Sequence, residues 1–345
     1  FKVDTRYVNT VGLRRHKEAG VGYYFSDRLI DWLGPRRKEE SADEPYVHYA
    51  AAMQKLFEDR CLELMDTYLA DVLRETGRLA FAGGGALNVK LNQRILERGD
   101  VRQLFVQPAA GDSGTALGAA AVVAAARGER VAPLRHVYLG PDYSNDQCLA
   151  ALSAHADSVA WETLDNVPAR AAALLAAGHP VAWFQGRMEF GPRALGARSI
   201  LGCASHAGIA DRINTQIKFR ERWRPFCPSI LDRVAEDMLQ TRHAAPYMTI
   251  TFDVAPHWRD RVPEVVHADG TARVQVVERA TNPRYYALLE QMEALTGNGV
   301  VLNTSLNRRG EPMVCSPEDA LDMFLGCDLQ YLMLEDHLVT KQAHD

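Results

Sequence analysis

Two short apolar strands, each followed by a glycine turn and a helix, constrain the fold of this sequence most. The first predicted strand, residues 78–82, leads into Gly83-Gly84-Gly85. The second, residues 103–106, is followed by Gly111-Asp112-Ser113-Gly114 and then by an alanine-rich helix that ends at Ala126. A strand that leads through a glycine turn into a helix is the repeating unit of α/β nucleotide-binding folds. The pattern therefore predicts an α/β fold in the first part of the chain.

The length and the helix-breaking residues predict two domains. A chain of 345 residues is long enough for two, since a domain holds roughly 100–200 residues. Residues 127–146 contain Gly140-Pro141 among other breakers and are typical of a crossing between domains. We expect one domain over residues 1–135 and a second, mixed α+β or α/β domain over residues 136–345.

Apolar periodicity predicts the elements on both sides of this crossing. A long helix is expected over residues 42–76. The expected helices of the second domain cover residues 166–178, 282–295 and 317–325. Its expected strands cover residues 181–184, 248–253, 272–277 and 298–302.

Composition excludes several classes of protein. With 39 Lys and Arg against 44 Asp and Glu, the net charge of −5 gives no global field that attracts nucleic acid or an anionic membrane. The longest run without a polar side chain, Ala116 to Ala126, has 11 residues, whereas a membrane span needs about 20. Six cysteines without a C-x-x-C pair argue against zinc and disulfides and favour a cytoplasmic protein. The polar N-terminus lacks a signal peptide and starts at Phe1 rather than Met, which suggests a processed or truncated chain.

The stretch Gly186–Ser199 is the most informative for function. Three arginines, three glycines and one proline occupy its fourteen residues, directly after an apolar strand. Guanidinium groups match phosphate and carboxylate oxygens, and glycines let the backbone approach a ligand closely. The stretch therefore favours an anion site over a solvated surface loop.

Cations alternate with aromatic residues over Lys218–Phe226. Such interleaving is compatible with stacking on single-stranded nucleic acid, although the negative net charge weakens that interpretation. A strand explains the pattern as well, because alternate side chains point to opposite faces. We expect a strand whose Lys and Arg side chains line a polyanion pocket.

Two further stretches carry polar side chains after predicted strands. Leu302–Asn307, followed by Gly310-Glu311-Pro312, offers neutral hydrogen-bonding groups that suit a planar amide or a phosphate. In His267–Arg273, Asp269-Gly270 has the sequence of a hairpin turn. A hairpin with incidental polar residues and a hairpin that contributes to a site remain equally open.

The two glycine turns also allow two interpretations each. Gly83-Gly84-Gly85 either approaches a nucleotide or forms a tight strand-to-helix turn. Asp112 either binds a metal or a phosphate-bound ion, or caps the helix that follows, and spacing alone favours the cap.

Together these five stretches resemble the NodU/CmcH family of O-carbamoyltransferases over nearly the whole chain. The strongest matches are Gly186–Ser199, Lys218-Phe219-Arg220 with Arg224-Pro225-Phe226, and Leu302–Asn307 with Arg309–Pro312. Lys218-x-Arg220 and Ser305-x-Asn307 also resemble the K-x-R…S-x-N pair of YrdC-like domains, which make carbamoyl adenylates.

The resemblance implies a division of labour between the two domains. The first would be the later part of an ASKHA-type, actin-like domain that transfers the carbamoyl group to a hydroxyl of a sugar or antibiotic-like acceptor. The second would be YrdC-like and convert carbamoyl phosphate and ATP to carbamoyl adenylate. The implied nucleotide-binding residues are Gly83, Gly84, Gly85, Asn88 and Gly114. Asp112 would be a ligand of a divalent metal, Mg or Fe.

The resemblance also assigns roles in the second domain. The implied catalytic residues are Arg193, Arg198, Lys218, Arg273 and Ser305. The implied substrate-binding residues are Arg187, Arg220, Arg224, His267, Asn303 and Asn307. The cations would clamp carbamoyl phosphate, Ser305 and Asn307 would orient the carbamoyl group or the ATP phosphates, and His267 would handle protons.

Three departures from the family pattern stand out. No two of the eleven histidines lie four residues apart, so the family's His-x-x-x-His metal pair is missing and we expect a fragment. Gly85 replaces the usual valine, and Ala197 stands where asparagine is frequent.

The alternatives to this function are a threonylcarbamoyl enzyme acting on tRNA, a hydrogenase-maturation carbamoyltransferase, a non-catalytic nucleotide-binding fragment and a binding protein for phosphorylated metabolites. We expect no membrane or nucleic-acid partner, and an oligomer remains open.

Overall fold

The computed structural model describes residues 6, 14–15, 22–23, 26–34, 38, 44–221 and 223–342. The chain forms two compact units, residues 1–65 and 66–345. The elements that begin in the first unit are β1 (Arg14–Arg15), β2 (Gly22–Tyr23), α1 (Asp27–Leu33) and α2 (Tyr46–Tyr68). Strands β1 and β2 pair antiparallel. The domain boundary expected between residues 135 and 136 lies inside the second unit and stays a prediction.

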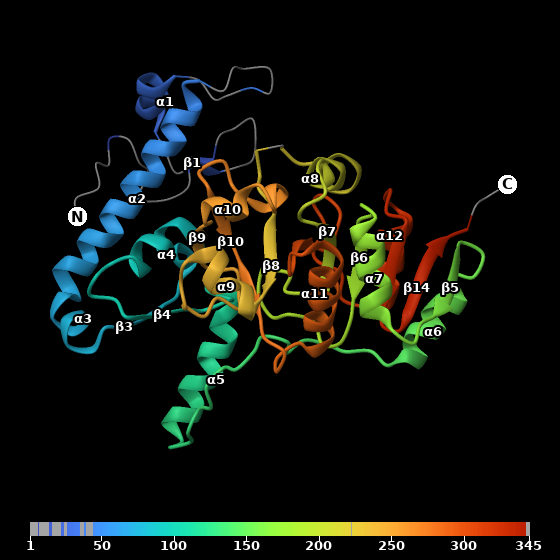
Figure 1. The fold of residues 1–345 in the computed structure, drawn as a ribbon. Helices are drawn as coiled ribbons and strands as arrows, with labels where there is room; N and C mark the ends of the chain where they lie inside the picture. Colours follow the sequence, from blue (N-terminus) through green and yellow to red (C-terminus); the bar gives the residue numbers. More distant parts are fainter. Residues whose placement is uncertain are drawn as a thin grey trace. The chain divides into compact units, whose positions relative to one another are not determined.

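The second unit begins with the strand–turn–helix arrangement that the sequence predicts (Figure 1). Its first elements are α3 (Ala70–Thr76), β3 (Arg78–Phe81), α4 (Val89–Leu96), β4 (Gln103–Val106) and α5 (Thr115–Ala126). Strands β3 and β4 are parallel, so a crossover must join them, and α4 provides it. Because the carboxyl ends of parallel strands lie at one edge, the two glycine turns are neighbours. The Gly83 amide donates to the Ala110 carbonyl at 2.8 Å.

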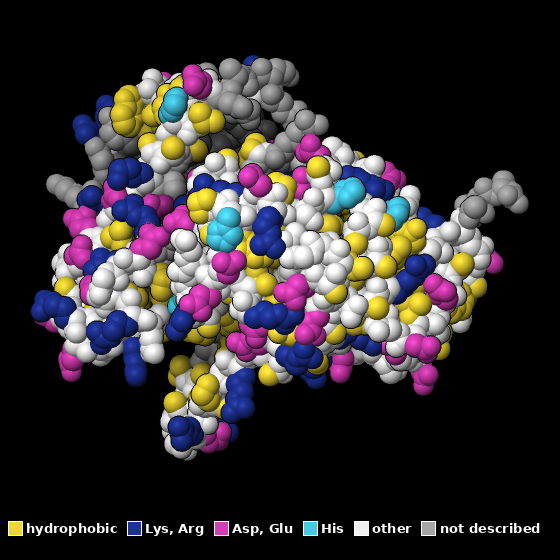
Figure 2. Space-filling model, viewed as in Figure 1, with side chains coloured by type: hydrophobic (Ala, Val, Ile, Leu, Met, Phe, Trp, Pro, Cys, Tyr) yellow, Lys and Arg dark blue, Asp and Glu magenta, His cyan; other side chains and the backbone are white. Residues whose placement is uncertain are grey.

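Helix α5 presents apolar side chains on the surface of the second unit. None of its residues is buried, and Val122 is 69% exposed (Figure 2). The long helix expected over residues 42–76 is in fact two helices, α2 and α3. They are separated at Leu69, whose backbone φ of −119° departs from helical geometry.

Eight strands of the described residues form one mixed sheet with the order β11-β8-β12-β7-β6-β13-β14-β5. Only the pairs β11–β8 and β6–β13 are parallel in this sheet. The bounds are β5 Val159–Thr163, β6 Val181–Phe184, β7 Arg198–Cys203, β8 Cys227–Leu231, β11 Gln275–Val277, β12 Val300–Ser305, β13 Tyr331–Leu334 and β14 His337–Lys341. The expected mixed α/β class is confirmed.

The central strands form the core because both of their faces are covered. Every residue of β6, β7 and β8 is buried, as expected for strands between helical layers. Helices α7 and α11 pack against each other and against the sheet, and α6 packs on α12 (Figure 1). The helices of this part are α6 (Asn145–Ala154), α7 (Val167–Ala176), α8 (Ile209–Ile213), α9 (Asp232–Leu239), α10 (Pro256–Arg259), α11 (Pro283–Thr296) and α12 (Pro317–Leu325).

Two strand predictions need correction. Residues 218–226 form no strand: a π-helix, Asn214–Lys218, ends at Phe219, whose φ is +46°, and β8 starts only at Cys227. The expected strand over residues 272–277 is two strands that belong to different sheets. One is β10 (Thr271–Arg273), which pairs antiparallel with β9 (Thr251–Asp253), and the other is β11. Because of these differences, Lys218 and Arg273 both lie near the amino-terminal end of β8. The alternation of side chains along a strand does not predict this position.

No helix in the described part of the chain is long and apolar enough to cross a membrane. All six cysteines are free thiols.

Candidate anion-binding site

The site lies where one end of the large sheet gathers chain segments that are far apart in sequence. Strand β12 runs antiparallel to β7 and β8, with Ser305 opposite Ser199 and Asn303 opposite Cys227. Its carboxyl end therefore meets the amino-terminal ends of β7 and β8. The segments that precede β7 and β8 carry the arginines and the lysine that the sequence analysis singled out.

Lys218 is buried in this corner and faces only neutral oxygens. Its side chain is 6% exposed. The ammonium Nζ, with three protons to donate, lies 2.5 and 2.9 Å from the carbonyl oxygens of Ser305 and Asn307, and 3.2 and 2.7 Å from Ser305 Oγ and Asn307 Oδ1. Burial, with a contribution from nearby Arg220, lowers the pKa of Lys218 to about 7. The expected association of Lys218 with Ser305 and Asn307 is therefore present in the structure.

The backbone around Lys218 is held by Asn214. The Asn214 side chain donates to the Arg220 carbonyl at 2.8 Å and accepts from Arg220 Nε at 3.2 Å. Phe219 between them has a positive φ, which is costly for a bulky residue. Such strained residues persist where the surroundings fix them, often at functional sites. Nothing in the sequence pattern indicated this role of Asn214.

Three arginines gather around the thiol of Cys227. Arg273 Nε donates to Cys227 Sγ at 3.0 Å. Arg193 and Arg220 both lie close enough to Arg273 and Cys227 for mutual electrostatic effects. Burial, and then the charge of Arg273, lower the pKa of Arg193 to about 10. We call Arg193, Lys218, Arg220 and Arg273 the cation cluster.

The cation cluster is short of negative charge. No carboxylate of the described residues is among the groups that shift the pKa of Arg193 or of Lys218. The pKa of Arg220 is affected by the carboxylate of Glu221, which is exposed and pairs with Arg224. The Arg220 guanidinium lies 4.1 Å from the centre of the Phe226 ring, and its Nη2 is buried without a hydrogen-bond partner in the described part of the chain. A buried donor without a partner is costly. The cluster therefore provides positive charge and at least one free donor for an anionic ligand.

Glu189 fixes the turn that carries Arg193. Its carboxylate Oε1 accepts hydrogen bonds from the amides of Leu195, Ala197 and Arg198 at 2.7, 2.7 and 3.2 Å. The side chain is 4% exposed, so the bonds form where water does not compete. The sequence analysis assigned no role to Glu189, although an acidic residue among three arginines was a visible signal.

Side chains from three neighbouring strands, β8, β11 and β12, support the same turn. Gln275 Nε2 donates to the Leu195 carbonyl at 2.9 Å, and Asn303 Nδ2 donates to the Ala194 carbonyl at 3.2 Å. Ser229 Oγ connects the two side chains, at 2.7 Å from Gln275 Oε1 and 3.0 Å from Asn303 Nδ2. Asn303, expected to bind substrate, thus lies in a buried network that supports the turn.

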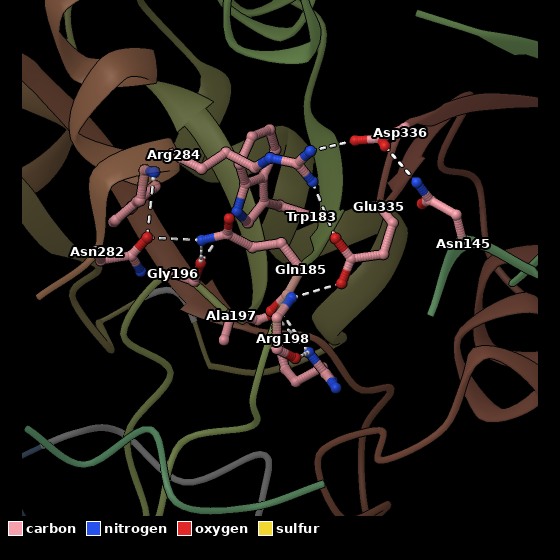
Figure 3. Close-up of polar contacts among 12 residues, drawn as sticks. Asn145, Trp183, Gln185, Gly196, Ala197, Arg198, Asn282, Arg284, Glu335 and Asp336 are labelled. Atoms are coloured by element: carbon pink, nitrogen blue, oxygen red, sulfur yellow. Dashed lines mark hydrogen bonds and ion pairs between the residues drawn. The ribbon is translucent and has the colours of Figure 1, made fainter. Parts of the chain in front are cut away.

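Gly196 is the tightest point of the turn. Its carbonyl accepts hydrogen bonds from Trp183 Nε1 at 3.0 Å and from Gln185 Nε2 at 2.8 Å (Figure 3). Its φ is +92°, and a Cβ at this position would overlap the ring of Tyr285. Only glycine fits this combination of backbone conformation and space.

Arg198, which is expected in the clamp, lies apart from the cations of the cluster. Its guanidinium is fully buried and stacks 3.5 Å from the centre of the Phe184 ring. Its nitrogens donate to main-chain carbonyls, including those of Gln185 and Gly186 at 3.0 Å (Figure 3). Because its N–H groups donate to main-chain carbonyls, Arg198 stabilises the fold around the site.

Arg187 and Arg224 also lie outside the cluster. Arg187 is exposed, donates to the Leu139 carbonyl at 3.0 Å and lines a separate cavity of about 310 Å³ with Tyr138 and Asn282. Arg224 is exposed and pairs with Glu221 at 2.9 Å. Burial lowers the pKa of Arg220, and Arg224 is still close enough for its charge to add to that shift, so Arg224 lies at the exposed edge of the cluster.

The glycine turns of the first part of the second unit have the expected form. Gly83 has a φ of +95°, and space is open around it and Gly84. The Asn88 side chain caps α4 by accepting from the Leu91 amide at 3.0 Å. A Cβ at Gly114 would overlap the Ala109 carbonyl, so that glycine is required by packing. A nucleotide contact at this open turn remains a prediction.

The metal expected at Asp112 is not supported by the residues around it. Asp112 is exposed and makes no side-chain cap. Within residues 44–221, 223–342 and the shorter described segments, no three His, Cys, Asp or Glu side chains come together as metal ligands. One carboxylate does not bind a divalent ion firmly. We therefore derive no step through a metal.

Fold and site together define a mixed α/β protein with a cation cluster, one buried lysine and three half-buried arginines, suited to an anionic ligand. Two family models match the chain: Carbamoyltransferase N-terminus over residues 16–121 and Carbamoyltransferase C-terminus over residues 172–341. The chain therefore belongs to the carbamoyltransferase family. The C-terminal match contains the whole cation cluster.

Several curated proteins are similar to this chain. An uncharacterized protein of Synechocystis sp. is 38% identical over 92% of this chain and 56% of its own length. Nodulation protein NolO of Bradyrhizobium diazoefficiens is 38% identical over 91% and 59%, and nodulation protein U of Rhizobium tropici is 38% identical over 67% and 39%. The chain thus spans about half the length of the curated relatives it matches. A crystal structure of T. kodakarensis HypF aligns at 18% identity with 58% of this chain, 26% of its own and a TM-score of 0.37, a likeness too weak to support an argument.

Proposed function

We propose that the chain acts in ATP-dependent O-carbamoylation. Residues 136–345 form carbamoyl adenylate from carbamoyl phosphate and ATP, and residues 1–135 take part in transfer to a hydroxyl of a sugar or antibiotic-like acceptor. The observation that carries the proposal is the cation cluster. Its positive charge, on a buried lysine and three half-buried arginines and with no carboxylate acting on Arg193 or Lys218, suits a small polyanion. The family membership supports carbamoyl as the transferred group.

The arginines of the cluster are suited to the phosphate end of carbamoyl phosphate. Guanidinium groups bind phosphate oxygens in a fork geometry, and the strength of such bonds rises where water is excluded. Arg220 Nη2, which has no described partner, supplies a donor. Arg193 extends into the cluster from the turn that Glu189 fixes. The turn therefore needs little rearrangement when the ligand binds.

Lys218, Ser305 and Asn307 form a second recognition element at the end of β12. Ser305 Oγ lies 2.6 Å from Asn307 Oδ1, and both side chains contact Lys218 Nζ. Hydroxyl and amide groups orient a planar carbamoyl group or the phosphates of ATP. A protonated Lys218 adds charge that the neutral oxygens around it leave uncompensated.

The chemistry requires position and charge rather than a protein nucleophile. Water cleaves the phosphorus–oxygen bond of carbamoyl phosphate to give carbamate and inorganic phosphate. The carbamate oxygen then attacks the α-phosphorus of ATP, a carbon–oxygen–phosphorus linkage forms, and pyrophosphate leaves. The cluster stabilises charge that develops on the phosphoryl oxygens, which is the largest single contribution in many enzymes. Its burial also limits water that would hydrolyse the adenylate.

The test is carbamoyl-phosphate-dependent exchange of pyrophosphate into ATP by the full 345-residue chain. We expect exchange in the wild type and a loss of roughly 30- to 1000-fold in Lys218→Met, which corresponds to about 2–4 kcal/mol. Lys341→Met is the matched control, since Lys341 lies on β14 and bonds the Cys327 carbonyl. Equal exchange in Lys218→Met and the wild type would exclude the proposed site.

The acceptor and the cellular location belong to the same proposal. Screening hydroxylated sugars and antibiotics for carbamoylation by the chain tests the acceptor class. Exchange without transfer to any acceptor would favour an adenylate-forming fragment, and exchange that requires threonine would favour the threonylcarbamoyl alternative. The free thiols agree with the expected cytoplasmic location, which localisation of a tagged chain would test.

A further inference from the structure

The hairpin formed by residues 267–273 carries a chain of hydrogen bonds that ends on a histidine. Lys90 Nζ donates to Asp269 Oδ2 at 2.9 Å. Asp269 Oδ1 accepts from the Thr271 hydroxyl at 2.6 Å and from the Thr271 amide at 3.1 Å. Thr271 Oγ1 in turn lies 3.2 Å from His267 Nδ1. The four side chains connect α4 with the hairpin that contains β10.

These contacts fix the tautomer of His267. A threonine hydroxyl has one proton, and an ionised carboxylate can only accept. Although burial opposes ionisation, hydrogen bonds from Thr271 and Lys90 lower the pKa of Asp269 to about 2. The Thr271 proton therefore points to Asp269, so His267 Nδ1 must be the donor to Thr271 Oγ1. In the neutral imidazole, Nε2 then carries a free lone pair.

The free nitrogen is not used by the fold. His267 Nε2 is buried and has no hydrogen-bond partner in the described part of the chain. Leaving a buried polar atom without a partner is costly, so His267 Nε2 would gain from a hydrogen bond to a bound molecule. Burial lowers the pKa of His267; the charge of Asp269 opposes this shift, and the charges of Arg273 and Lys90 add to it. The ring is therefore neutral at pH 7 and able to accept a proton.

His267 lies beside the cation cluster. Thr271 and Arg273 are two residues apart on β10, so their side chains leave the strand on the same face. Arg273 belongs to the cluster through its bond to Cys227 and is close enough to act on the charge of His267. An oriented, neutral base next to a phosphate-binding group is the arrangement that general-base catalysis needs.

The stoichiometry of the proposed function leaves a role for such a base. Carbamoyl phosphate and ATP give carbamoyl adenylate, pyrophosphate and inorganic phosphate only if one water molecule is consumed. We propose that His267 Nε2 is the general base for this water, with Thr271, Asp269 and Lys90 as its positioning residues. The inference rests on the proposed function, because it assumes carbamoyl phosphate in the cation cluster.

In this step the water oxygen bonds to the phosphorus of carbamoyl phosphate while its proton passes to His267 Nε2. The bridging phosphorus–oxygen bond breaks, and its electron pair stays on the carbamate oxygen. Inorganic phosphate leaves, and the carbamate is the nucleophile for the α-phosphorus of ATP. The proton on His267 is released to solvent when the products dissociate.

The deciding variant is His267→Asn, whose amide can still donate to Thr271 Oγ1 but offers no basic nitrogen. We expect carbamoyl-phosphate-dependent pyrophosphate exchange to fall roughly 10²- to 10⁴-fold. Ammonium carbamate, supplied in place of carbamoyl phosphate, should restore exchange to within a few-fold of wild type. His257→Asn is the matched control, since His257 is an exposed histidine paired with Asp237 at 3.2 Å. Thermal unfolding of each variant confirms that it is folded.

Thr271→Val and Thr271→Ser test the positioning residues. The valine variant should lose part of the carbamoyl-phosphate-dependent rate and recover it with carbamate, whereas the serine variant should retain the hydroxyl and the rate.

Each outcome decides the inference. Unchanged exchange in His267→Asn, or a loss that carbamate does not relieve, would overturn it while leaving the proposed function intact. A wild type that exchanges with carbamate but not with carbamoyl phosphate would also overturn it. A wild type inactive with both substrates would refute the proposed function and the inference together.

Discussion

The charge on Lys218 can be tested with sulfate, which stays doubly negative from pH 6 to pH 9 and so does not titrate itself. The ordinary pKa of lysine, 10.5, falls to about 7 at Lys218 because the side chain is buried, with Arg220 nearby. At about 1.4 kcal/mol for each pKa unit, the protonated form is about 5 kcal/mol costlier here than in water. An anion in the cation cluster would offset that cost and favour protonation.

Sulfate affinity should therefore depend steeply on pH. Below pH 7 the ammonium is present and binding is strongest, and above pH 7 binding must take up a proton. Affinity should fall roughly tenfold per pH unit, or about 100-fold between pH 7 and pH 9. Isothermal titration calorimetry in buffers of different ionisation enthalpy measures both the affinity and the proton uptake. Lys218→Met should bind weakly at every pH, while Lys341→Met should follow the wild type.

The same pKa has an opposite effect on stability, which gives an independent check. Because the pKa of Lys218 is lower in the folded than in the unfolded chain, the unfolded chain binds more protons between pH 7 and 10.5. The free energy of unfolding should therefore rise with pH across this window, and the full cost of the buried charge should be present below pH 7. Lys218→Met should lack this rise in urea denaturation. A sulfate affinity that is constant from pH 6 to pH 9, together with equal pH dependence of stability in both proteins, would refute the reasoning.

Two further predictions separate residues that build the site from residues that bind the anion. Gly196→Ala should lower the free energy of unfolding by about 2–4 kcal/mol, because a Cβ there overlaps Tyr285 at a positive φ. Gly186→Ala, also at a positive φ but in open space, should cost only about 1 kcal/mol; equal costs would contradict the steric argument. Arg198→Met should destabilise by at least about 3 kcal/mol, since it leaves several buried carbonyls unpaired. Arg193→Met should change the free energy of unfolding by no more than about 1 kcal/mol and lower sulfate affinity more than tenfold. Chemical denaturation and calorimetry measure the two effects. The reverse pattern would mean that Arg198 binds the anion and Arg193 stabilises the fold.

Local patterns in the sequence determined most of the regular structure. Strand β6 and helix α12 have the expected bounds, and α7 and α11 differ from them by one or two residues. These segments are predictable because an apolar stripe or an apolar run must be buried wherever the segment lies. The glycine turns after β3 and β4 were predictable because glycines follow each predicted strand, although the need for glycine comes from a positive φ at Gly83 and from packing against Ala109 at Gly114.

The residue types of the site could also be predicted from the sequence, but only as a set of candidate residues. Arginine, lysine and amide side chains in glycine-rich surroundings indicate an anion site. Lys218, Ser305 and Asn307 were expected to act together and do lie together. The proposal of an anionic ligand followed from the residue types, whereas the residues that lie together in the cluster could not be predicted from them.

Tertiary structure decided which arginines join the cation cluster. Arg193 and Arg198 are five residues apart in one motif. Arg193 belongs to the cation cluster, whereas Arg198 donates to backbone carbonyls. Likewise Asn303 became a support for the turn rather than a ligand contact. The reason is that the role of a polar side chain depends on which partners meet it, and those partners come from strands and loops that only the folded sheet brings together.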